Sequence, residues 1–165
     1  MIKIRGATPS DAGAFLTFLN QLDRETKFML YEPGERKANE ENLRSKIEET
    51  NKDSLLLVAE NEDKIVGFLS ADRGHSNRIK HSAYIVIGIL KDFRGKGIGN
   101  KFFEELDKWA IQSWVLRLEL TVMKNNGNAI RLYEKVGFKI EGVKEKSCLV
   151  DGVFIDEYYM SKLLI

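Results

Sequence analysis

Cysteine is almost absent from this chain of 165 residues, in which Cys148 stands alone. One thiol cannot form a disulfide framework or a cysteine-based zinc site within one chain, and we expect no metal. No histidine-bearing constellation accompanies Cys148 in its predicted strand. We therefore interpret it as a small, buried or half-buried hydrophobic residue and not as a nucleophile.

An excess of charge and long apolar runs are lacking as well. The chain holds 26 Lys and Arg residues against 25 Asp and Glu, which gives a net charge of +1. No overall field therefore draws it to nucleic acid or to an anionic membrane. The longest apolar runs, such as Tyr84–Leu90, are too short to span a bilayer, and the first residues carry no apolar signal segment. We expect a cytoplasmic protein with no nucleic-acid partner and no membrane partner.

Proline is scarce, since Pro9 and Pro33 are the only two. Neither a repeat nor a low-complexity stretch marks a domain boundary. The composition, with 43% hydrophobic and 31% charged residues, is that of a globular protein. We expect a single domain over residues 1–165.

Hydrophobic periodicity and turn signals predict an α/β (α+β) order of elements. Strands are expected over residues 2–5, 54–60, 64–71, 83–90, 115–123, 138–149 and 153–163. Helices are expected after the cap at Thr8–Asp11 and over residues 39–51, 97–113 and 127–136. Asp151-Gly152 is a strong hairpin signal between the last two strands. The order predicts a mixed, mostly antiparallel sheet with one parallel crossover and helices on both faces.

A glycine-rich loop, RGKGIG at residues 94–99, lies between a buried strand and an amphipathic helix. Glycines at alternate positions allow a sharp turn and close approach to a ligand. The following helix leaves its first amides unpaired, and its dipole favours an anion there. Arg94 and Lys96 add positive charge, so the loop is suited to phosphate. The alternative is a plain strand-to-helix turn with solvated charges.

Two other phosphate motifs do not match this loop. A dinucleotide fingerprint needs glycine at the position that Asn100 occupies, and the spacing GxxxxGK[ST] of the P-loop is absent. Readings as a nucleotide-dependent oxidoreductase or as an NTPase are therefore disfavoured.

Two sequence blocks resemble the GCN5-related N-acetyltransferase (GNAT) superfamily. RGKGIG resembles the family signature [RQ]-x-x-G-x-[GA]. VMKNNGNAIRLYEKVGF resembles its second block through Val122, Asn126, Ala129, Tyr133, Gly137 and Phe138. The closing stretch, DGVFIDEYYMSKLL, is similar to that of bacterial members that acetylate polyamines, amino acids or protein N-termini.

The resemblance implies a GNAT-like acyl-CoA N-acyltransferase fold and direct acetyl transfer from acetyl-CoA to a primary amine in a ternary complex. Strands 83–90 and 115–123 would splay apart and admit the pantetheine, and a strand amide would serve as oxyanion donor. The implied cofactor contacts are Ile87, Ile89, Leu90, Arg94, Gly95, Lys96, Gly97, Ile98, Gly99, Asn126, Ala129 and Tyr133.

Tyr133 lies one helical turn after Ala129. The resemblance implies that its hydroxyl is the acid at the leaving thiolate, since a phenol keeps its proton near neutral pH. The alternative is a core tyrosine with no catalytic role. A non-catalytic acyl-CoA-binding module remains a competing function, against which the presence of Tyr133 argues.

The general base and the acceptor stay open. Tyr84 stands near the place where many relatives carry a glutamate, so the base of those relatives is not carried over. Tyr84, Glu119 and Glu32 are tentative substrate residues; other candidates for the base or the acceptor wall are Asp72, His75, His81, Glu25 and Glu35. The acceptor is a polyamine, an amino-acid-like compound or a protein N-terminus. Since relatives are often dimers, a homodimer is one expectation for the oligomeric state.

Overall fold

Seven strands form one sheet in the order β1-β2-β3-β4-β5-β7-β6. The computed structural model describes every residue from Met1 to Ile165. The strands are β1 (Ile2–Gly6), β2 (Leu55–Asn61), β3 (Lys64–Arg73), β4 (Ser82–Ile89), β5 (Arg117–Met123), β6 (Lys139–Val150) and β7 (Val153–Leu163). Every neighbouring pair is antiparallel except β4 and β5. The predicted mixed, mostly antiparallel sheet is confirmed.

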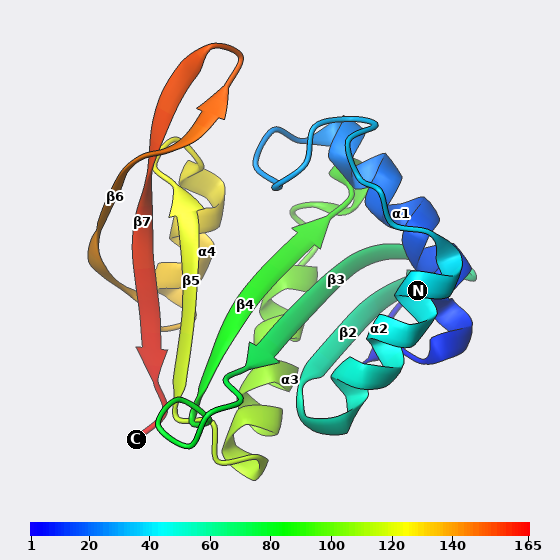
Figure 1. Ribbon diagram of the computed structural model, residues 1–165, viewed down its shortest axis with the longest axis horizontal. Helices are drawn as coiled ribbons and strands as arrows, with labels where there is room; N and C mark the ends of the chain where they lie inside the picture. The colour runs from blue at the N-terminus through cyan, green and yellow to red at the C-terminus, as the bar shows by residue number, and fades with distance from the viewer.

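Four helices cover the two faces of the sheet (Figure 1). They are α1 (Ala12–Glu25), α2 (Glu40–Asp53), α3 (Ile98–Gln112) and α4 (Gly127–Lys135), with short 3₁₀ turns η1 (Pro9–Asp11) and η2 (Lys91–Phe93). None of the helices is long and apolar enough to cross a membrane.

Glycines in the sheet show which helix covers which face. A Cβ atom at Gly88 in β4 would lie 2.5 Å from Leu22 of α1, and one at Gly67 in β3 would lie 3.3 Å from Phe102 of α3. Because side chains alternate along a strand, even-numbered residues of β4 face α1 and odd-numbered ones face α3.

An aromatic cluster fills the core on each face. Phe68 of β3 packs edge-on against Phe15 and Phe18 of α1 at centroid distances of 5.6 and 5.8 Å. On the other face, Phe103 of α3 packs against Tyr133 of α4 and Phe138 at 5.9 and 5.7 Å. Tyr133 therefore belongs to the core that holds α3 and α4 against the sheet.

Candidate functional site

The parallel strands β4 and β5 separate after a short paired stretch. Their register runs only from Ser82–Tyr84 on β4 and from Arg117–Glu119 on β5. Beyond these residues the two strands diverge, as Figure 1 shows. The gap predicted between strands 83–90 and 115–123 is therefore present in the fold.

The backbone of β4 offers hydrogen-bonding groups to this gap. The Leu90 N–H donates to the Val66 carbonyl at 2.9 Å, so even-numbered residues of β4 pair with β3. The N–H and C=O groups of Ile87 and Ile89 point to the opposite side, where pairing with β5 has ended. Arg94 Nε donates a hydrogen bond to the Ile89 carbonyl at 3.0 Å, so this carbonyl is already occupied. The two Ile87 groups and the Ile89 amide thus face the gap.

Leu90 does not share this arrangement, although the resemblance implied a cofactor contact there. Its N–H is bound to Val66, its carbonyl accepts from the Phe93 N–H at 2.9 Å, and its side chain is buried. Neither backbone group is free for a ligand, because Leu90 ends the β3 ladder and starts η2. Leu90 therefore has no free N–H to offer, and its contact with the cofactor stays a prediction.

The glycine loop lies where β4 ends and α3 begins. Gly95 and Gly97 have φ angles of +72° and +81°, and a Cβ atom at either position would meet nothing within 4 Å. Gly97 is the N-cap of α3, and no side chain caps the first amides of the helix. The backbone is therefore open toward an anion, as a phosphate cradle requires. Lys96 lies with its ammonium 5.5 Å from the centre of the Phe93 ring.

Gly99 plays a different part from that of the other two glycines. It is buried in α3, and a Cβ atom there would lie 2.8 Å from Leu132 of α4. Glycine at this position lets the two helices pack closely. Asn126 caps α4 by accepting a hydrogen bond from the Ala129 N–H at 3.3 Å. The close approach of Gly99 to Leu132 holds α4 against the start of α3, where the glycine loop ends.

Tyr133 is 8% exposed, and its hydroxyl makes no hydrogen bond to any group of the protein. Burial, with a smaller contribution from the nearby Tyr84 phenol, raises the pKa of Tyr133 above its usual range. The phenol therefore holds its proton and has it free to donate.

A cluster of polar side chains lies on the α1 side of the sheet, opposite α3 and α4, where β4 and β5 separate. The hydroxyls of Tyr84 on β4 and Thr121 on β5 are hydrogen-bonded at 2.8 Å. Arg117 donates to Glu119 at 2.7 Å and to both carboxylate oxygens of Glu141 at 2.6 and 3.1 Å. Hydrogen bonding from Arg117 lowers the pKa of Glu141 to about 2. These residues line a cavity of about 370 Å³.

Glu141 was missed by sequence reasoning, since no local pattern links it to Arg117. It lies at a register shift of β6 between Ile140 and Gly142, two strands away from β5. Glu119, a candidate base, accepts a hydrogen bond from Arg117 Nε at 2.7 Å.

The acidic residues expected in an acceptor wall have other partners. Glu25 accepts from the Lys91 N–H and from Gln21 Nε2, both at 2.8 Å, and so joins the end of α1 to the turn before the glycine loop. Glu35 accepts from the Glu32 N–H at 3.0 Å in an exposed turn. Glu32 lines neither of the two cavities described in this section. The contact of Glu25 with a cationic amine stays a prediction.

The histidine candidates lie away from the gap. His75 Nδ1 is 3.4 Å from Asp53 at the end of α2. The His81 carbonyl accepts from the amides of Leu116 and Arg117, where β4 and β5 are still joined. The remaining candidate, Asp72, pairs in register with Tyr84 from the neighbouring strand β3.

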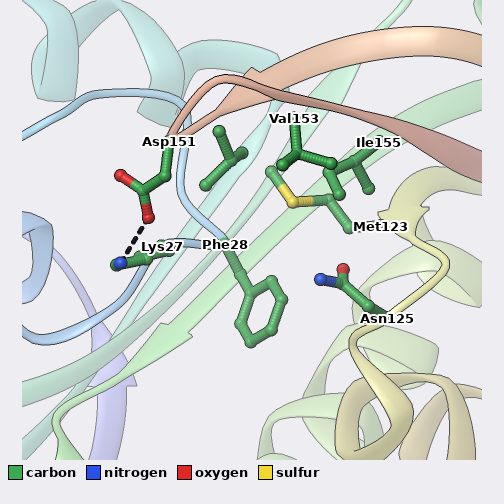
Figure 2. Close-up of a pocket in the computed structure, with 8 residues that line it drawn as sticks. Lys27, Phe28, Met123, Asn125, Asp151, Val153 and Ile155 are labelled. Atoms are coloured by element: carbon green, nitrogen blue, oxygen red, sulfur yellow. Dashed lines mark hydrogen bonds and ion pairs between the residues drawn. The ribbon is translucent and has the colours of Figure 1, made fainter.

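A second cavity, of about 340 Å³, lies at the wide end of the gap. Figure 2 shows it between Lys27 and Phe28, Met123 and Asn125, and the tip of the β6–β7 hairpin. Lys27 forms an ion pair with Asp151 across its rim. Three segments far apart in the sequence thus meet here.

Comparisons with known proteins agree with this geometry. A family model described as "Acetyltransferase (GNAT) family" matches residues 16–138. The L-amino acid N-acetyltransferase AaaT of Escherichia coli (strain K12) is 34% identical over 111 residues, which cover 65% of this chain and 67% of that relative. A crystal structure of a GNAT-family acetyltransferase from Streptococcus pneumoniae superposes with a TM-score of 0.95, at 32% identity and over 100% of both chains.

A structure of yncA, described as a putative acetyltransferase from Salmonella typhimurium with its cofactor acetyl-CoA, shares the fold. Its TM-score is 0.88 at 20% identity, over 100% of this chain and 95% of the other.

Proposed function

The chain belongs to the GNAT acetyltransferase family, and from this premise we propose that it transfers the acetyl group of acetyl-CoA directly to the α-amino group of an amino-acid-like acceptor. The observation that carries the proposal is the separation of β4 from β5 between the glycine loop and Tyr133. It leaves backbone groups of Ile87 and Ile89 unpaired on the β5 side. The open amides of the glycine loop follow β4 in the chain, and the protonated phenol of Tyr133 lies near Tyr84, where the pairing ends.

The residues present fit acetyl-CoA. The open backbone at Gly95 and Gly97, with the uncapped amides of α3, would hold the pyrophosphate. Arg94 and Lys96 add charge beside it. The free groups of Ile87 and the Ile89 amide would pair with the pantetheine amides as a neighbouring strand does. When bound, acetyl-CoA supplies an activated acetyl group as a thioester.

Two groups of the chain would act on that thioester. An amide facing the gap, such as that of Ile87, donates to the carbonyl oxygen as negative charge develops, a contribution typically worth about 3–4 kcal/mol. The amine nitrogen forms the new bond to the carbonyl carbon and loses a proton to water. As the carbon–sulfur bond breaks, the Tyr133 hydroxyl gives its proton to the departing sulfur. Water then returns a proton to the phenolate.

The absence of a free carboxylate on β4 favours an α-amine as acceptor. Tyr84 is bound to Thr121, and Glu119 is held by Arg117. Deprotonating an alkylamine of pKa ~10.4 near pH 7 costs about 5 kcal/mol, whereas a peptide α-amine of pKa ~8 costs about 1 kcal/mol, and the α-amine of a free amino acid lies between the two. Water can meet the smaller cost without a dedicated base. The curated relative described above is named for L-amino acids, which supports the same acceptor class.

The test is a turnover assay that follows thiol release from acetyl-CoA with L-leucine, glycine, an N-terminal peptide and spermidine. We expect the α-amines to be acetylated well and spermidine poorly. A thermal-shift assay run in parallel should show stabilisation by CoA but not by NAD or ATP, about 2.7 kcal/mol at 100 times Kd. Binding of CoA without thiol release for any amine would instead indicate a non-catalytic binding module.

A further inference from the structure

The cavity of about 340 Å³ beside the gap has a mostly apolar wall. Phe28 enters from the α1–α2 segment, Met123 from the end of β5, and Val150, Val153 and Ile155 from the β6–β7 hairpin. Phe28 and Val153 remain 43% and 58% exposed. Apolar surface gathered from three segments and left uncovered has a favourable free energy of burial still to be gained.

The rim of this cavity carries charge. Lys27 and Asp151 form an ion pair whose side chains are 71% and 64% exposed. Exposed pairs of this kind contribute little to stability, so one partner can be exchanged without much cost. Asn125 adds an amide on the side of β5.

Met123 places this cavity at the end of β5, beyond the stretch that pairs with β4. It is the last residue of β5, on the part of the strand that pairs with β7 but no longer with β4. A molecule seated against Met123 and Phe28 can thus reach the gap with a group that projects from it. The wall is apolar, and the rim carries the ammonium of Lys27 beside the carboxylate of Asp151.

We propose that this cavity receives the acceptor, that the acceptor is an amino acid with a neutral apolar side chain, and that Lys27 binds its α-carboxylate in exchange for Asp151. This inference rests on the proposed acetyl transfer to an α-amine and adds the substrate class. The apolar wall matches the side chain, the ammonium of Lys27 matches the carboxylate, and the α-amine is directed to the gap.

The other cavity is less suited to this acceptor. Its only cation, Arg117, is already bound to Glu119 and by two hydrogen bonds to Glu141. A substrate carboxylate would have to displace the bidentate contact between Arg117 and Glu141. Arg117, Glu119 and Glu141 together also carry a net negative charge. This other cavity is better matched to a cationic amine, which is not the preferred acceptor of the proposed reaction.

The side-chain part is tested by comparing kcat/KM for L-leucine, L-methionine, glycine, L-aspartate and L-lysine. We expect leucine and methionine to exceed the other three by roughly tenfold or more. In Val153→Asp, the value for leucine should fall roughly 10- to 100-fold while that for glycine changes little.

Leu149→Asp is the matched control. Leu149 is 63% exposed and pairs with Phe154, so alternation along the hairpin places it on the opposite face from Val153. The same charge introduced there should leave the preference for leucine unchanged. The wild-type substrate series tests the idea even if Val153→Asp does not fold.

The carboxylate part is tested with L-leucine and L-leucinamide, which differ at the carboxylate. We expect the wild-type protein to prefer leucine, Lys27→Met to lose roughly tenfold of that preference, and Lys27→Arg to keep most of it. Comparing the ratio between variants cancels the different amine pKa values of the two compounds.

Failure of this inference is distinct from failure of the proposed function. Acetylation of α-amines with no preference for apolar side chains, or with an unchanged leucine-to-leucinamide ratio in Lys27→Met, would overturn the site and leave α-amine transfer intact. A clear preference for polyamines over all amino acids would overturn both.

Discussion

Replacing Tyr133 with phenylalanine removes one hydroxyl group from the centre of the site. The hydroxyl has no hydrogen-bond partner in the protein, and the ring packs in a triangle with Phe103 and Phe138 at centroid distances of 5.9 and 6.0 Å. Phenylalanine keeps those ring contacts. We expect the free energy of unfolding to change by less than about 0.5 kcal/mol, because no intramolecular hydrogen bond is lost.

The expected kinetic effect is much larger. General acid assistance is typically worth about 10²–10⁴-fold, or roughly 3–5 kcal/mol of the barrier. If the Tyr133 hydroxyl acts only as the thiolate departs, its loss lowers kcat and leaves the affinity for acetyl-CoA within a few-fold. Since burial raises the pKa of Tyr133, the phenol stays protonated, and the wild-type kcat should not fall through phenol ionisation up to about pH 9.

The assay is steady-state kinetics with a good acceptor, combined with direct titration of acetyl-CoA and denaturant unfolding. Tyr31→Phe is a suitable control, since Tyr31 lines neither cavity and its ring can still lie against Arg36. A folded Tyr133→Phe protein with near-native turnover would refute the catalytic role. A loss confined to acetyl-CoA affinity would make Tyr133 a cofactor contact and assign proton delivery to water.

Three further predictions concern the surrounding structure. Gly97→Ala and Gly34→Ala each place a side chain at a φ near +80° in open space, so each variant should lose about 1–2 kcal/mol of stability. Only Gly97→Ala should also weaken CoA binding, measured by calorimetry. An equal loss of CoA affinity in both variants would contradict the assignment of the glycine loop as the phosphate cradle. Glu25→Ala removes the acceptor for the Lys91 amide and should weaken acetyl-CoA binding roughly 2- to 10-fold with kcat nearly unchanged; native affinity would argue against this link. Hydrogen bonding from Arg5 lowers the pKa of Asp11 to about 2, so this carboxylate should contribute about 1–2 kcal/mol above pH ~4 that is lost as the pH falls toward 2; unfolding of Asp11→Asn by denaturant across this range should lack that part of the acid sensitivity.

The amino-acid sequence alone determined the caps, turns and periodic segments of this protein, because these features depend on residues close together in the chain. A helix was expected over residues 127–136, and Asn126, the residue before it, caps it by accepting from the Ala129 N–H, because an N-cap acts within four residues. Gly95 and Gly97 adopt the positive φ angles that a tight phosphate loop needs, which follows from the lack of a Cβ atom. The buried strands and amphipathic helices could be predicted from the sequence, because their hydrophobic periodicity lies within one element.

Only the tertiary structure decided how these elements meet. The pairing of β4 with β5 stops at Tyr84, Arg117 finds Glu141 across β7, and Glu25 reaches Lys91 from 66 residues away. Lys27 and Asp151 are 124 residues apart and close the rim of one cavity. Strand register and helix packing fix these contacts. Because register and packing are set by the free energy of the whole chain, no local sequence pattern predicts these contacts.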